Sequence, residues 1–140
     1  MKKIQYKYKS IAVSQKPMKY ELVPIIPITI SYKSNEMTVE ALIDSGASFC
    51  FCPIEIAKEL AIPLERCPIV KLTGVGGTVS VYLHKLNVNL EFGRVIIPSD
   101  VGFGKFSFHG FSFVLGQRDF FEKIDILFLR RKGKIELHLP

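Results

Sequence analysis

Short segments in which apolar residues occupy every second position recur along this chain, and this period of two constrains the fold more than any other feature. In a β-strand successive side chains point to opposite faces, so each such segment is expected to be a strand with one buried face. A polar break at residues 33–36 also predicts a hairpin that spans Leu22 to Glu40. The alternating segments are 37–44 (MTVEALID), 78–83 (TVSVYL), 87–92 (NVNLEF) and 135–139 (IELHL).

Two stretches have the apolar spacing of short helices instead. IEIAKELA follows Pro53, a residue suited to a first helical turn, and QRDFFEKI follows Gly116. In the second stretch Arg118 and Glu122 stand four residues apart as an opposite-charge pair. We therefore expect a mainly β fold, closed or sandwich-like, with one or two short helices.

The basic charge is concentrated at the start of the chain. The 140 residues are enough for one domain, and a hydrophobic content of 48% argues against a disordered chain. Residues 1–20 hold six lysines and no acid, whereas residues 21–140 hold thirteen basic and thirteen acidic side chains. We expect a solvated basic arm at 1–20, a domain at 21–140, and no nucleic-acid partner, since the body is neutral.

Membrane and secretory signals are weak. Charged and polar residues interrupt the first residues, so no secretory leader is expected. The apolar run from Leu22 to Tyr32 contains two prolines and is far shorter than the roughly 20 residues of a membrane helix, so no membrane partner is expected. The three cysteines cannot all pair within one chain, which favours a reducing compartment, the cytoplasm.

An aspartate is placed on a tight turn in ALIDSGASFCFCP, residues 41–53. Asp44, Ser45 and Gly46 make the turn, and the small residue Ala47 leaves it. The apolar flanks suggest that this turn lies inside the protein, where an ionised carboxylate is costly without a function. The simplest alternative is a turn aspartate that bonds its own backbone.

Two later segments complete a pattern. LTGVGGTVSVY, residues 72–82, places a glycine-rich tip on a long hairpin that could fold over a ligand. FVLGQRDFF, residues 113–121, is an apolar strand that ends at a glycine and enters a helix. In this order, Asp-Ser-Gly-Ala, a glycine-rich hairpin tip and apolar-apolar-glycine before a helix resemble the retropepsin-like aspartic proteases. The resemblance covers the chain from about Leu22 to its end.

The resemblance implies a role for each matching residue and a closed β barrel or sandwich with a flap hairpin. Asp44 is the catalytic carboxylate, and Ser45 is the hydroxyl that orients the dyad. The active-site loop is supported by Val114, Leu115 and Gly116. The residues implied to bind substrate are Gly46, Ala47, Gly74, Val75, Gly76 and Gly77. Retroviral members brace the loop with an ion pair, but the corresponding positions here hold Gln117 and Ser48.

Peptide hydrolysis by this chemistry needs two carboxylates that share a proton. None of the other aspartates is followed by Ser-Gly or Thr-Gly, so the expected active species is a homodimer with both Asp44 side chains on its twofold axis. The terminal strands, including Ile135, Leu137 and Leu139, are the expected interface, and deletion of 134–140 is expected to give an inactive monomer. The expected substrate is an extended peptide or protein segment with apolar side chains at the scissile bond.

Other features of the sequence are compatible with functions besides peptide hydrolysis. A catalytically silent dimer of the same fold could act as a peptide-binding module, which an Asp44→Asn variant distinguishes. The spacing of Cys50 and Cys52 does not suit a structural zinc site, so buried thiols and no metal are expected. The glycine-rich tip lacks the lysine and helix of a phosphate loop, and no cofactor is expected. The phenylalanines between 103 and 113 are interpreted as packing beneath the hairpin rather than as base-stacking groups.

Overall fold

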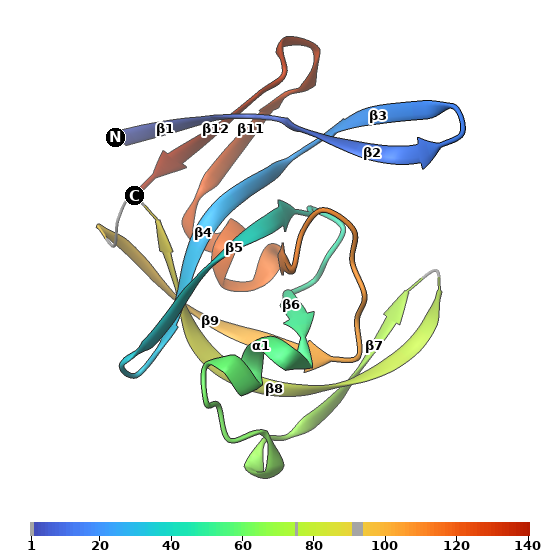
Figure 1. The fold of residues 1–140 in the computed structure, drawn as a ribbon. Coiled ribbons are helices and arrows are strands. Elements are labelled where there is room, and N and C mark those ends of the chain that lie inside the picture. Colours follow the sequence, from blue (N-terminus) through green and yellow to red (C-terminus); the bar gives the residue numbers. More distant parts are fainter. Residues whose placement is uncertain (1, 75, 91–93) are drawn as a thin grey trace.

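The computed structural model describes residues 2–74, 76–90 and 94–140, and strands dominate it (Figure 1). The strands are β1 (Lys2–Lys7), β2 (Lys9–Gln15), β3 (Met18–Val23), β4 (Ile25–Tyr32), β5 (Asn35–Ile43), β6 (Cys50–Pro53), β7 (Ile69–Gly74), β8 (Gly77–Leu90), β9 (Val95–Gly104), β10 (Phe113–Leu115), β11 (Asp125–Leu129) and β12 (Lys134–Leu139). The helical segments are α1 (Ile54–Glu59) and the short turns η1 (Leu64–Arg66), η2 (Gln117–Phe121) and η3 (Arg130–Lys132).

The main sheet closes on itself. Its strands follow the order β4-β5-β10-β6-β9-β8-β7, and β4 also pairs with β8, so all of them except β7 form a ring. The alternating side chains of these strands meet inside the ring, where Ile26, Ile30 and Val88 are fully buried. The expectation of a mainly β, closed fold with short helices is therefore confirmed.

The predicted hairpin at 22–40 is present, and two other predicted segments merge. In β4 and β5 the last pair is Tyr32 with Asn35, so the chain turns at Lys33 and Ser34. Segments 78–83 and 87–92 are parts of one strand, β8, rather than two, and the end of the second segment lies outside the described residues. Because β8 is long, its first half pairs with β7 beyond the ring while its second half belongs to the ring.

A second sheet has the order β1-β12-β11. The C-terminal strand β12 is its centre, with β1 on one side and β11 on the other. The apolar face of β12, formed by Ile135, Leu137 and Leu139, is buried in the core of its own chain. These three side chains are therefore covered by their own chain and do not face a second copy. The expectation that the terminal strands lie at a dimer interface stays a prediction for the rest of this sheet.

The first residues do not form a solvated arm, in contrast to the sequence-based expectation. Strand β1 pairs with β12 along its whole length, and β2 pairs with β3 as a two-stranded hairpin that projects from the ring (Figure 1). In β1 polar residues alternate with Ile4 and Tyr6, and these two side chains pack against the core. The division after residue 20 falls within β3, and this domain boundary stays a prediction.

The helix predicted after Pro53 is confirmed as α1, with Pro53 at its N-cap. The helical stretch after Gly116 is irregular, because Asp119 has a positive φ of 70°. The predicted Arg118–Glu122 pair is replaced by other contacts. A Glu122 carboxylate oxygen accepts the backbone N–H of Asp119 at 2.7 Å, and Arg118 lies 4.0 Å from the carboxylate of Asp100.

Candidate active site

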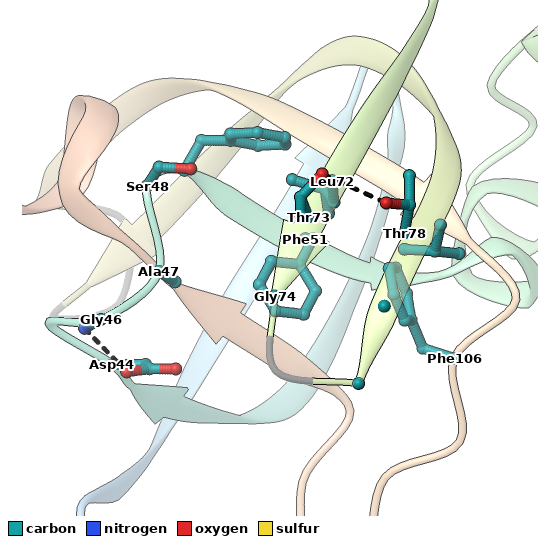
Figure 2. A pocket seen from close by; sticks show the side chains of 14 residues that line it. Asp44, Gly46, Ala47, Ser48, Phe51, Leu72, Thr73, Gly74, Thr78 and Phe106 are labelled. Carbon is teal, nitrogen blue, oxygen red and sulfur yellow. Dashed lines mark hydrogen bonds between the residues drawn. The ribbon is translucent and has the colours of Figure 1, made fainter.

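Asp44 lies where β5 ends, on a turn held by main-chain hydrogen bonds. Its N–H donates to the carbonyl of Leu115 at 3.0 Å, and its own carbonyl accepts the N–H of Ala47 at 3.1 Å. The N–H of Gly46 donates to Asp44 Oδ1 at 2.9 Å, which fixes the orientation of the carboxylate (Figure 2). Asp44 is half-buried, whereas Ser45 and Gly46 are exposed, so the turn lies at the surface of the chain and not inside it as expected.

Strand β10 supports this turn from behind. It lies between β5 and β6, parallel to the first and antiparallel to the second. The register sets Leu115 beside Ile43 and Val114 beside Phe51. Gly116 follows, and a Cβ at this position would stand 2.5 Å from the carbonyl oxygen of Phe49, which no side chain tolerates. The segment from Val114 to Gly116 thus lies where the resemblance placed it, against the Asp44 turn.

Gln117 and Arg118, whose roles could not be assigned from the sequence, also bind the loop that contains Asp44. The side-chain amide of Gln117 donates to the carbonyl of Ser45 at 2.8 Å, and its backbone N–H donates to the carbonyl of Ala47 at 2.9 Å. The backbone N–H of Arg118 donates to the carbonyl of Ser48 at 3.0 Å. These uncharged contacts take the place of the ion pair that retroviral members use.

A cavity of about 390 Å³ opens in front of Asp44. The Asp44 turn forms one wall, and the tip of the β7–β8 hairpin forms the facing wall (Figure 2). The hydroxyls of Thr73 and Thr78, which lie opposite each other near this tip, are 3.3 Å apart. The described lining residues are Asp44, Gly46, Ala47, Ser48, Phe49, Phe51, Leu72, Thr73, Gly74, Gly76, Gly77, Thr78, Val79 and Phe106.

Asp44 and five of the six residues predicted to bind substrate line this cavity, whereas Val114, Leu115 and Gly116 lie behind the Asp44 turn and not in the lining. Ser45 lies on the same turn but is not part of the lining, and Val75 lies outside the described residues. Of the described residues that line the cavity, Asp44 alone carries an ionisable side chain. One chain therefore presents a single carboxylate to whatever occupies the cavity.

Aromatic residues that the sequence analysis treated as packing form another wall. The rings of Phe51 and Phe106 have centroids 5.0 Å apart, and both line the cavity. The row continues outward with Phe108 and Phe111, whose centroids lie 4.8 Å apart in a stacked arrangement. All four side chains are partly exposed. The cluster of phenylalanines at 106, 108 and 111 was the sequence signal for part of this wall, and the exposed rings form an apolar surface beside the cavity.

The thiols lie apart from this chemistry. Cys50 and Cys52 are buried and unpaired, as expected, and Cys67 is half-buried. Burial raises the pKa of Cys50 to about 11 and that of Cys52 well above its usual value, so both thiols are neutral at physiological pH.

Within the described part of the chain, no three His, Cys, Asp or Glu side chains gather as a metal site would need. None of the described helices has the length and apolar character to cross a bilayer.

The closed ring, the Asp-Ser-Gly turn against β10 and the facing hairpin tip together define a retropepsin-like aspartic protease fold. A retropepsin-like aspartic protease from Rickettsia conorii matches with a TM-score of 0.58 and 14% identity, over 97% of this chain and 91% of that one. The EIAV protease, solved with an inhibitor, matches with a TM-score of 0.52 and 20% identity, over 69% and 84% of the two chains. A search of curated proteins found no match.

The sequence itself carries the family assignment. The family model described as aspartyl protease matches residues 26–127, which is most of the chain and includes Asp44, the β7–β8 hairpin and the segment after β10. The chain belongs to the aspartyl protease family.

Proposed function

We propose that this protein is an aspartic endopeptidase that hydrolyses peptide bonds in extended polypeptide segments as a homodimer. The observation that carries the proposal is the carboxylate of Asp44, which is the one ionisable side chain among the described residues of the cavity. The loop geometry supports it, because the Gly46 N–H holds Oδ1 and leaves the other oxygen for a partner. No cofactor is part of the proposal.

The chemistry requires a second carboxylate from another copy of the chain. One ionised Asp44 accepts a proton from water as the water oxygen attacks the peptide carbonyl carbon. The other, neutral Asp44 donates a hydrogen bond to the carbonyl oxygen. When the C–N bond breaks, a proton passes to the leaving nitrogen, and the products are a carboxylate and an amine.

The other parts of the cavity have roles in this scheme. The β7–β8 hairpin acts as a flap whose glycine-rich tip closes over the substrate. Ser45 orients the dyad by bonding across to the partner's loop. An extended peptide lies between the flap and the dyad. Its backbone forms hydrogen bonds with the protein backbone as an added strand would, and its alternate side chains enter pockets. Phe51 and Phe106 favour large apolar side chains next to the scissile bond.

The compartment we propose is the cytoplasm. The support is the state of the cysteines, of which Cys50 and Cys52 are buried as free thiols and Cys67 is free and half-buried. Free thiols persist in reducing compartments.

The test compares the parent with Asp44→Asn on a library of unstructured peptides. The parent is expected to cut next to large apolar residues, and Asp44→Asn is expected to lose cleavage while it keeps the fold and the affinity for peptides. Asp125→Asn, an exposed aspartate on β11, is the matched control and is expected to cut as the parent does. Peptide binding by the parent without cleavage would instead support a silent peptide-binding module.

A further inference from the structure

A short strip of chain after β10, residues 117–119, joins the loop of residues 44–49 to strand β9 of the ring. The backbone N–H groups of its first two residues donate to carbonyls of the loop. Its third residue, Asp119, binds the strand instead, because Asp119 Oδ2 accepts the backbone N–H of Asp100 at 2.8 Å. The strip is therefore hydrogen-bonded to the loop on one side and to the ring on the other.

The backbone of Asp119 has a conformation that few side chains adopt. Its φ is 70° and its ψ is −59°, and it follows an extended residue, Arg118, with a φ of −65° and a ψ of 132°. Glycine is the residue that most easily takes a positive φ in such a turn, because it has no Cβ. A non-glycine residue held in this conformation beside a candidate active site indicates that its side chain has a use there.

The N–H group that Asp119 binds lies just beyond the reach of the neighbouring strand. Strand β6 pairs with β9 from Cys50 opposite Val101 onward, and Asp100 is the residue before Val101. A backbone N–H that is withdrawn from water needs an acceptor. The Asp119 carboxylate supplies one at the end of β6, and the half-buried side chain is thereby tied to the ring.

Ion pairs at the same place are weaker attachments than this hydrogen bond. The carboxylate of Asp100 lies 3.0 Å from Lys85 Nζ and 4.0 Å from a guanidinium nitrogen of Arg118. The side chains of Lys85 and Arg118 are 73% and 53% exposed, so water screens both pairs. The short bond between an ionised carboxylate and a backbone N–H is the firmer contact.

Core packing fixes the far end of the strip but not its orientation. Phe120, the next residue, is fully buried. The rotations about φ and ψ of Asp119 lie between this anchored ring and the two N–H groups that face the loop. The conformation of Asp119 therefore decides whether those N–H groups point at the loop carbonyls.

We infer that Asp119 is a positioning residue for Asp44: its hydrogen bond to Asp100 fixes the 117–119 strip to the ring, and the strip fixes the loop that carries the carboxylate. This inference rests on the proposed function, because the proposed reaction makes the position of that carboxylate matter. Asp119 is not part of the cavity lining. Its loss is expected to change kcat rather than KM, since the groups that contact the substrate are kept.

The test compares Asp119→Gly with Asp119→Asn. Glycine allows the positive φ but removes the acceptor, whereas asparagine keeps an acceptor oxygen and tolerates positive φ better than most residues. We expect kcat for peptides to fall about tenfold in Asp119→Gly, with KM within about twofold of the parent. Asp119→Asn is expected to restore kcat to within about twofold. Asp125→Gly, at an exposed aspartate on β11, is the matched control and is expected to keep the parent's kcat.

Amide hydrogen exchange supplies a readout that needs no substrate. The N–H groups of Ala47, Gln117 and Arg118 are all hydrogen-bonded at the loop. They are expected to exchange about tenfold faster in Asp119→Gly, whereas the N–H groups of strand β12 keep the parent's rate. A residue that contributed only to overall stability would speed exchange in both places.

The two readouts separate this inference from the proposed function. An equal rise of exchange in β12 refutes the positioning role, and so does unchanged exchange at the loop. If the parent cuts peptides and Asp119→Gly cuts them with the same kcat, the role is also refuted. If exchange at the loop rises as expected but the parent cuts no peptide, the anchoring of the loop by Asp119 stands and the proposed function fails.

Discussion

Hydrogen bonds from β10 and from the segment that follows it hold the Asp44 turn in place. Leu115 accepts the N–H of Asp44, and Gln117 binds the carbonyl of Ser45 with its side chain. Because that side-chain contact is a single neutral hydrogen bond at an exposed residue, its net contribution is of the order of 1 kcal/mol. Because Ser45 is the residue next to Asp44, loss of this hydrogen bond is expected to affect the position of the Asp44 carboxylate in the proposed reaction.

Replacing Gln117 with Leu removes this donor and keeps most of the side-chain volume. We expect kcat to fall by roughly fivefold, which corresponds to about 1 kcal/mol, while KM and the unfolding temperature stay close to those of the parent. Gln5→Leu is the matched control, since Gln5 is an exposed glutamine on β1 whose side chain donates to Glu136, far from the turn in sequence. An unchanged kcat for Gln117→Leu would show that the loop needs no support from this side chain.

Asp44 could be predicted from the sequence because the Asp-Ser-Gly-Ala motif consists of consecutive residues, which can be recognised without knowing the fold. The contribution of Gln117 could not be predicted in the same way. Its amide reaches Ser45 across 72 positions of sequence, and only the packing of β10 between β5 and β6 brings the two together. The wall formed by Phe51 and Phe106 was missed for the same reason.

Among the elements, β12 shows the difference between predicting a strand and predicting its neighbours. The alternation of Ile135, Leu137 and Leu139 predicted the strand correctly. It also indicated that one face must be buried, but it could not say whether the chain itself or a second copy buries it. The structure gives that role to the chain's own core, because β1 and β11 pair with β12 and set its apolar face inward.

Leu137→Ala tests this burial. Truncating a fully buried leucine leaves a cavity, so we expect the free energy of unfolding to fall by about 2–5 kcal/mol in urea titrations. Leu127→Ala on the neighbouring strand β11 is the control, because Leu127 is 44% exposed and its truncation leaves no cavity. Equal losses for the two variants would contradict the assignment of β12 to the core. Deletion of 134–140 is accordingly expected to unfold the chain.

The glycines of the β7–β8 hairpin allow a test of its proposed role as a flap over the substrate. Gly77 has a φ of 109°, a conformation that side chains with a Cβ rarely adopt, whereas a Cβ on Gly74 meets no atom within 4 Å. Gly77→Ala is expected to strain the tip by about 1 kcal/mol or more and to lower kcat/KM for peptides. Gly74→Ala adds a methyl group without strain and is expected to lower kcat/KM less than Gly77→Ala does. If Gly77→Ala is as active as the parent, the conformation of the hairpin tip is not needed for substrate binding.

For the whole molecule, the central issue is that one chain contributes one carboxylate, whereas the proposed reaction uses two. The ring, the supported turn and the hairpin tip make a complete cavity within the chain, yet its described lining holds Asp44 as the sole ionisable group. The lack of a second Asp-Ser-Gly or Asp-Thr-Gly motif predicted a second copy of the chain, and the proposed dimer requires that copy to approach the side that carries the Asp44 turn.

A mixing experiment tests the pairing of Asp44 most directly. Parent and Asp44→Asn chains are combined in varying proportions at constant total concentration, allowed to exchange, and assayed for peptide cleavage. If both carboxylates of a dimer are needed, activity follows the square of the parent fraction, and an equal mixture retains about one quarter of the full activity. If the activity instead falls in direct proportion to the parent fraction, to about one half, each chain works alone and the shared dyad is wrong.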